Sequence, residues 1–143
     1  MLKYIVITGA SKGIGKEIAD HLSIDNNYKI INISRNKNKN PKITNYSCDI
    51  GNYNQVKKVF KKIKSINILI NNSGVTNYSK DPIDNFNKII QTNLNGFFYC
   101  SFEASKLLKK KKNSTIINIS SINSHQGFPN NPGYVSSKGG VKL

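Results

Sequence analysis

The stretch Tyr4-Ile5-Val6-Ile7-Thr8-Gly9-Ala10-Ser11-Lys12-Gly13-Ile14-Gly15 decides the fold. An apolar, β-branched run ends here in three glycines, and a helical pattern follows, because Ile14, Ile18 and Leu22 recur four residues apart. A strand, a glycine turn and a helix in this order let backbone N–H groups at the helix N-terminus face the phosphates of a dinucleotide. The spacing G-x-x-x-G-x-G is neither the G-x-G-x-x-G fingerprint nor a Walker loop, so a plain tight turn stays open as an alternative.

Short β-branched runs alternate with helical patterns along the rest of the chain, which is typical of βαβ units on a parallel sheet. We predict strands at residues 4–8, 29–34, 43–47, 66–71 and 114–120. All but the third are nearly continuous Ile and Val, so we expect them to be buried on both faces. Helices are expected after strands one and three, at Asp81-Pro82, from about Leu94 to the lysine run at residues 109–112, and from Tyr134. The pattern predicts a single domain spanning residues 1–143.

Composition excludes several classes of protein. The chain has neither the repeats of collagen or a coiled coil nor a disulfide framework. Its 143 residues carry 22 basic and 7 acidic side chains, a formal charge of +15. We predict no membrane span and no signal peptide, and expect Cys48 and Cys100 to be buried thiols of a cytoplasmic protein. A charge-driven binder of nucleic acid or an anionic surface stays open; such a protein would depend on the lysines at 109–112. The favoured interpretation is a solvated surface that binds neither nucleic acid nor membrane.

The residue that selects between NAD and NADP is expected about twenty residues beyond the glycines, at the end of the second strand. An acidic residue there would bind the ribose 2′-hydroxyl of NAD, but this chain has Ser34-Arg35. Arg35, the only arginine of the chain, can bind a 2′-phosphate with two hydrogen bonds, and Lys12 adds a charge from the glycine loop. The sequence therefore favours NADP over NAD, with two ordinary surface cations as the alternative.

The last third of the chain combines Ser121 after the fifth strand with Tyr134 and Lys138 thirteen and seventeen residues further on. Four residues apart on a helix, Tyr134 and Lys138 share one face. A phenol transfers protons at neutral pH when a neighbouring cation favours its anion, and a serine hydroxyl can hold a substrate oxygen. His21 and His125 lack the spacing of metal ligands, so no metal site is predicted.

Together these motifs resemble the short-chain dehydrogenase/reductase superfamily over the whole length of the chain. The matching elements are Thr8 to Gly15, Asp49-Ile50, Asn71-Asn72-Ser73-Gly74, Asn93, Ser121, and Tyr134 with Lys138. Ser73 stands where the family usually has alanine. The resemblance implies an α/β, Rossmann-type doubly wound parallel sheet of strand order 3-2-1-4-5, and hydride transfer between NADP(H) and a carbonyl or alcohol substrate.

The resemblance also implies roles for single residues. Tyr134 would be the general acid or base, Lys138 would favour its phenolate and grip the nicotinamide ribose, Ser121 would polarise the carbonyl, and Asn93 would fix a water of the proton relay. The implied cofactor-binding residues are Gly9, Ser11, Lys12, Gly13, Ile14, Gly15, Arg35, Asp49, Ile50, Asn72, Gly74, Tyr134 and Lys138. Two alternatives stay open, in which Asp49 or Asn93 only caps a helix, and Asn71 is expected to stabilise the sheet.

Members of the family continue past the Tyr134 helix with two more strands and a flap over the substrate. We therefore expect this chain to be C-terminally incomplete, truncated before the last strands, and a non-catalytic dinucleotide-binding remnant is an alternative. The substrate class is open, with 3-oxoacyl thioesters as an analogy. The helices from Leu94 and Tyr134 resemble those that pair between subunits, so a homo-oligomer is expected.

Overall fold

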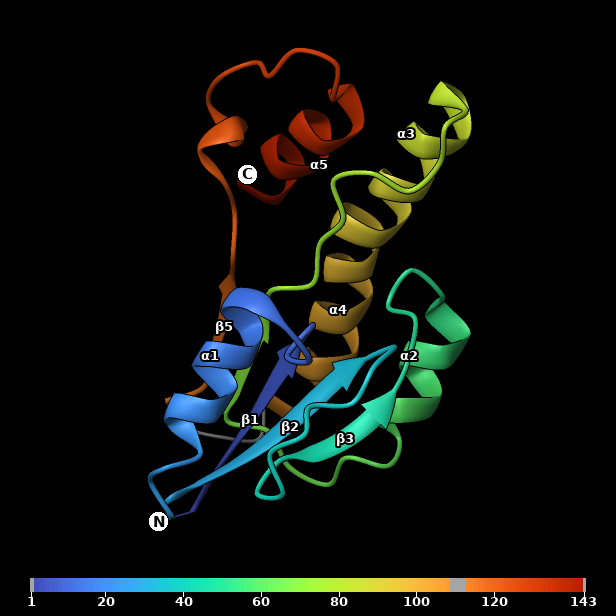
Figure 1. Ribbon diagram of the computed structural model, residues 1–143. Coiled ribbons are helices and arrows are strands. Elements are labelled where there is room, and N and C mark those ends of the chain that lie inside the picture. Colours follow the sequence, from blue (N-terminus) through green and yellow to red (C-terminus); the bar gives the residue numbers. More distant parts are fainter. Residues whose placement is uncertain (1, 109–112, 143) are drawn as a thin grey trace.

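A five-stranded parallel sheet forms the centre of the molecule (Figure 1). The computed structural model describes residues 2–108 and 113–142. The strands are β1 (Lys3–Thr8), β2 (Tyr28–Ser34), β3 (Thr44–Ser47), β4 (Ile68–Asn71) and β5 (Thr115–Asn118), in the order β3-β2-β1-β4-β5. The predicted Rossmann-type sheet and its strand order are confirmed, and each observed strand overlaps its predicted range.

Helices cover both faces of the sheet, which makes it doubly wound. On one face, Ile5, Ile7 and Ile30 pack against Ala19 of α1 (Gly13–Leu22). On the other face, Val6 and Leu69 pack against α2 (Tyr53–Phe60) and α4 (Gly96–Leu108). Because neighbouring residues of a strand point to opposite faces, a continuous run of Ile and Val supplies both cores.

The predicted helix boundary near Leu94 is wrong. Helix α3 (Pro82–Ile90) begins at the predicted cap, where Asp81 accepts a hydrogen bond from the N–H of Asp84 at 2.7 Å. It then continues through a π-helical segment, η1 (Gln91–Asn95), directly into α4. The wider π turn changes the phase of the apolar residues, which imitates the start of a new helix in the sequence. Within α4, Phe97 is buried, whereas Phe98 and Phe102 are exposed.

The prediction that the fifth strand is buried on both faces is also wrong. All four residues of β5 are exposed, with Ile116 at 37% and Ile117 at 42%. Within the described residues, β5 pairs only with β4 and forms the edge of the sheet. A β-branched sequence indicates that the segment forms a strand. It does not show whether the strand is buried, because burial depends on which elements cover it.

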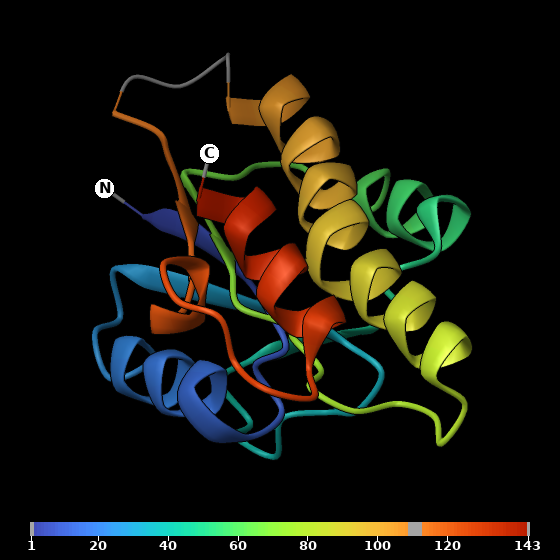
Figure 2. The same cartoon turned by 90° about the horizontal axis from the view of Figure 1, so that it is seen from above.

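The last helix, α5 (Pro132–Lys142), lies above the carboxyl ends of the strands and beside α3 (Figure 2). A short 3-10 helix, η2 (Ile122–Ser124), lies between β5 and the loop that precedes α5, and it contacts α5. Cys48 and Cys100 are free and buried, as predicted. The lysine run at 109–112 lies outside the described residues. No helix in the described part of the chain is long and apolar enough to span a bilayer.

Candidate active site

A cleft of about 350 Å³ opens at the carboxyl ends of β1 to β4. Parallel sheets bind ligands at this edge, where the strand order reverses direction. Ten of the predicted cofactor-binding residues line the cleft: Gly9, Ser11, Lys12, Gly13, Ile14, Arg35, Asp49, Ile50, Asn72 and Gly74. The topology therefore brings together residues that are up to 65 positions apart, from Gly9 to Gly74.

The glycine loop leaves the start of α1 open to the cleft. Gly9 has φ +72°, and a Cβ there would lie 2.8 Å from the hydroxyl of Ser73, so a larger residue would be strained and would clash. Lys12 occupies the N-cap position in an extended conformation, and no side chain caps the helix. The first N–H groups of α1 therefore present the positive end of the helix dipole to the cleft, which suits an anionic ligand.

Gly15 does not line the cleft but lies buried behind it. A Cβ on Gly15 would overlap the amide nitrogen of Asn72 and would lie 2.6 Å from the carbonyl oxygen of Gly9. Asn72 uses that amide to donate to the carbonyl oxygens of Thr8 (3.1 Å) and Gly9 (3.3 Å). The third glycine thus allows Asn72 to join the ends of β1 and β4.

Arg35 and Asp49 line the same cleft from the segments that follow β2 and β3. The side chain of Arg35 is exposed. Asp49 accepts a hydrogen bond from the N–H of Gly51 at 3.0 Å, whereas α2 is capped by Asn52, whose side chain accepts from the N–H of Gln55 at 3.1 Å. The alternative in which Asp49 serves only as the cap of the next helix is therefore not what the structure shows.

Lys138 is a buried cation near Gly74, with an exposed fraction of 3%, and it does not itself line the cleft. Its Nζ donates to the carbonyl oxygen of Ile119 at 2.7 Å and lies 5.2 Å from the centre of the Phe97 ring. The ring of Tyr134 lies on the same side, 5.8 Å from Nζ. Burial lowers the pKa of Lys138 below its ordinary value. Helix α5 begins two residues before Tyr134, so the predicted pair shares one helical face.

Asn93 is fully buried in the π-helical segment, so it caps no helix. Its Oδ1 accepts from the N–H of Val75 (2.8 Å), and its Nδ2 donates to the carbonyl oxygen of Val75 (2.9 Å) and to Oγ of Ser137 (3.2 Å). The position of a Cβ on Gly74 would be 3.7 Å from Oδ1 of Asn93 and 3.9 Å from Nζ of Lys138. Gly74, a lining residue of the cleft, therefore adjoins both side chains.

Ser121 lies between β5 and α5, where its Oγ accepts from the N–H of Asn123 at 3.2 Å and caps η2. The preceding residue, Ser120, donates from Oγ to the carbonyl oxygen of Lys138 at 3.3 Å. The bond from Ser120 holds the middle of α5 against the segment that follows β5. The four predicted catalytic residues thus belong to segments that meet at the carboxyl ends of β4 and β5.

The cleft also includes residues that are not among the predicted cofactor-binding residues: Ser34, Asn36, Cys48, Ser73, Val75 and Thr92. Most are immediate neighbours of predicted residues, and this adjacency was the available signal; Thr92 is next to Asn93 in the π-helical segment. Burial, with a smaller effect from the charge of Asp49, raises the pKa of Cys48 to about 11, so this residue is a thiol at neutral pH.

Comparison with known proteins agrees with this geometry. Residues 3–143 match the family model described as short chain dehydrogenase. The chain belongs to the short-chain dehydrogenase family. Among curated family members, the chain is 34% identical to the 3-oxoacyl-acyl-carrier-protein reductase of Buchnera aphidicola subsp. Baizongia pistaciae, over 97% of this chain and 63% of that protein. It is 28% identical to a 3β-hydroxysteroid dehydrogenase of Mediterraneibacter gnavus, over 97% of this chain and 56% of that protein.

Solved structures of the family show the same fold. The ligand-free aldohexose dehydrogenase of Thermoplasma acidophilum superposes with a TM-score of 0.87 at 34% identity, over 98% of this chain and 57% of that one. The NADP-bound structure of ElxO superposes with a TM-score of 0.84 at 32% identity, over 99% of this chain and 64% of that one. The chain therefore spans less than two thirds of the length of these relatives.

Proposed function

We propose that this short-chain dehydrogenase transfers hydride between NADP(H) and a carbonyl or alcohol substrate. The observation that carries the proposal is that the glycine loop and Gly74 line one cleft. The glycine loop suits phosphates, and Gly74 adjoins Asn93 and Lys138, which do not themselves line the cleft. The relative that is 34% identical, a 3-oxoacyl-acyl-carrier-protein reductase, supports the same class of reaction.

The residues present fit a dinucleotide phosphate. The uncapped N-terminus of α1 offers N–H donors for the pyrophosphate. Among the described residues, nothing beyond the adjoining backbone lies within 4 Å of the position of a Cβ on Gly13, so the loop leaves room for a ligand. Arg35 would bind the 2′-phosphate, Lys12 would add charge, and Asp49 with Ile50 would flank the adenine. The bound cofactor would supply or accept the hydride.

For the proton, we assign Tyr134 as the general acid of reduction and the general base of oxidation. The neighbouring cation of Lys138 favours the anion that Tyr134 becomes when it gives its proton to the carbonyl oxygen. The hydrogen bond to Ile119 fixes the Lys138 ammonium in place. Ser121 would hold the substrate oxygen by its hydroxyl, and Asn93 would contribute through a water held near Lys138.

We further propose that the protein is a cytoplasmic homo-oligomer, and the exposed aromatic face of α4 supports the oligomer. Phe98 is 64% exposed and Phe102 is 46% exposed, with ring centres 6.0 Å apart. Two adjacent exposed rings are unusual on a solvated helix and suit a helix-pairing face. Light scattering on the full-length gene product should show a dimer or tetramer, and Phe98→Glu with Phe102→Glu should shift the mass toward the monomer.

The decisive experiment follows NADPH oxidation by the full-length gene product with a panel of carbonyl compounds that includes a 3-oxoacyl thioester. Tyr134→Phe should lower kcat by about 10²- to 10⁴-fold, whereas NADPH should still bind through the residues that line the cleft. Tyr28→Phe, at the opposite end of the sheet, is the matched control. Absence of turnover with every carbonyl, together with NADPH-dependent thermal stabilisation, would instead support a non-catalytic binding protein.

A further inference from the structure

Two asparagine side chains hold the backbone of Ala10, the buried residue between the first glycine and the exposed part of the glycine loop. Oδ1 of Asn32, in β2, accepts from the N–H of Ala10 at 3.0 Å. Nδ2 of Asn38, in the segment between β2 and β3, donates to the carbonyl oxygen of Ala10 at 2.8 Å. Both polar groups of one peptide position are thus fixed by side chains more than twenty residues away.

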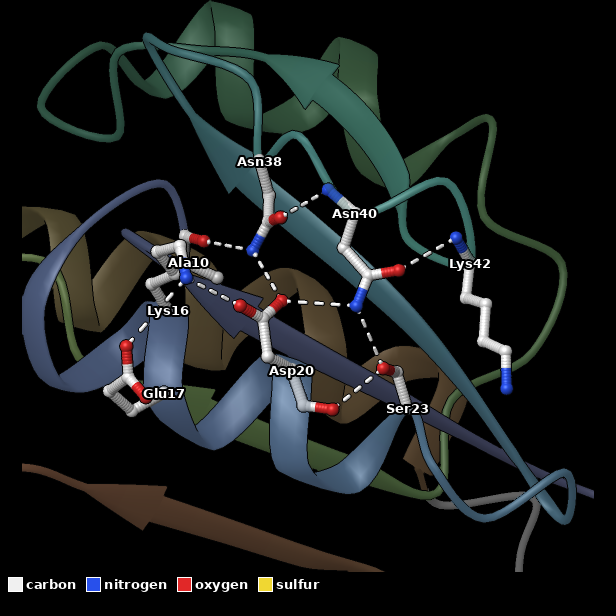
Figure 3. Close-up of polar contacts among 8 residues, drawn as sticks. All are labelled: Ala10, Lys16, Glu17, Asp20, Ser23, Asn38, Asn40 and Lys42. Atoms are coloured by element: carbon white, nitrogen blue, oxygen red, sulfur yellow. Dashed lines mark hydrogen bonds and ion pairs between the residues drawn. The ribbon is translucent and has the colours of Figure 1, made fainter.

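Asn38 also connects the glycine loop to the helix that follows it. Its side chain lies between Ala10 and Asp20, a residue of α1 (Figure 3). Nδ2 donates to Oδ1 of Asp20 at 3.3 Å, and Lys16 holds the other carboxylate oxygen at 2.6 Å. Oδ1 of Asn38 accepts from the N–H of Asn40 at 2.8 Å. With an exposed fraction of 4%, Asn38 exchanges these partners for water only if the segment opens.

The contacts continue to the wall of the cleft that carries Arg35. Nδ2 of Asn32 donates to Oδ1 of Asn45 at 2.8 Å and to the carbonyl oxygen of Asn36 at 3.2 Å. The same Oδ1 of Asn45, in β3, accepts from the N–H of Asn38 at 2.8 Å. One connected set of asparagine bonds therefore joins the glycine loop to the segment after β2.

From this geometry we propose that Asn38 is a positioning residue for dinucleotide binding, which acts by fixing the peptide of Ala10 before the cofactor arrives. The inference rests on the proposed function and extends it to a residue that does not line the cleft. A loop held in its bound conformation loses less entropy on binding, so the affinity for the pyrophosphate is higher. The pyrophosphate is common to NADP and NAD, so Asn38 acts equally on both cofactors.

The test compares Asn38→Asp with Asn40→Asp in the full-length gene product. In both variants a carboxylate replaces an amide that donates to Oδ1 of Asp20, so the net charge changes equally. The variants differ in the second partner of that amide, which is the carbonyl oxygen of Ala10 for Asn38 and Oγ of Ser23 (3.0 Å) for Asn40. In N38D, a carboxylate oxygen faces the carbonyl oxygen of Ala10, and this repulsion should release the loop. We expect Kd for NADPH and for NADH to rise by about tenfold in N38D, with their ratio unchanged, and to stay within about twofold in N40D.

A second measurement needs no cofactor. Hydrogen exchange of the backbone amides at residues 9–14 should be faster in N38D than in N40D when both are compared with the unmodified protein. Equal exchange in the two variants, or equal affinities, would overturn the inference. If N38D does not fold, Asn38→Ala replaces it, with an expected rise of about fivefold in both Kd values. A protein that binds neither cofactor would overturn the proposed function, and the exchange measurement would still decide whether Asn38 holds the loop.

Discussion

The Nζ atom of Lys138 lies 5.8 Å from the centre of the Tyr134 ring, one helical turn away on α5. The same atom is held by the carbonyl oxygen of Ile119, at the end of β5. The hydrogen bond to this carbonyl prevents the lysine from turning away from the Tyr134 ring. The helix and the strand end therefore depend on each other for the geometry of this pair.

The burial of Lys138 predicts a pH dependence of stability. Because burial lowers the pKa of Lys138 in the folded chain, the unfolded chain binds more protons between that pKa and the ordinary value of 10.5. The free energy of unfolding therefore gains a contribution from Lys138 as the pH rises through this interval. Lys138→Met lacks this contribution, so the unmodified protein should become more stable relative to the variant as the pH approaches 10.5.

Urea unfolding at about pH 7 and about pH 10 measures this difference. Lys88→Met, which removes an exposed lysine from α3, is the control and should show the same change between the two pH values as the unmodified protein. A constant difference between Lys138→Met and the unmodified protein at both pH values would contradict the role of burial.

Asn93 should stabilise the fold through Val75. Asn93→Ala leaves the N–H and the carbonyl oxygen of Val75 without their partner and should lower the free energy of unfolding by about 2–3 kcal/mol. Asn95→Ala, in the same π-helical segment, removes one bond to Gln91 on a half-buried side chain and should cost about 0.5 kcal/mol. If urea unfolding shows the same loss of unfolding free energy in both variants, the buried bonds to Val75 contribute no more to stability than the half-buried bond to Gln91.

The sheet and much of the cleft could be predicted from the sequence because their signals are local. A β-branched run predicts a strand, and residues after consecutive parallel strands meet at one edge of the sheet. This reasoning brought Gly9, Arg35, Asp49 and Gly74 to one cleft.

Features that depend on tertiary contacts could not be read in the same way. A π turn shifts the phase of the apolar residues as the start of a new helix would. The sequence pattern therefore predicts two separate helices where α3, η1 and α4 run on without a break. An asparagine can cap, turn or bridge, and only the fold shows that Asn32 and Asn38 both bond to Ala10. Likewise, the β-branched sequence of Ile116 and Ile117 does not show which elements cover them.

The choice between NADP and NAD should depend on Arg35. Arg35→Asp replaces the cation expected to bind the 2′-phosphate by an anion that repels it and can instead accept from a ribose hydroxyl. The ratio of kcat/KM for NADPH to that for NADH should fall by about 10²-fold or more and reverse the preference. Lys37→Asp makes the same change of charge in the same segment, at an exposed residue that does not line the cleft. If the two variants change the ratio equally, long-range charge alone sets the preference, and the assignment of Arg35 is wrong.

Two glycine substitutions should change stability in opposite directions. In Gly15→Ala, the new methyl group overlaps the amide of Asn72 and meets the carbonyl oxygen of Gly9, so Asn72 must give up its bonds to Thr8 and Gly9. The loss should be about 2–4 kcal/mol, because a steric clash and two lost hydrogen bonds add together. Gly139→Ala places the same methyl group on α5, where no other described element comes within 4 Å, and should stabilise the protein by about 0.5–1 kcal/mol through helix propensity. Thermal and urea unfolding measure both, and a Gly15→Ala protein as stable as the unmodified one would mean that β1 and β4 can be joined without this close approach.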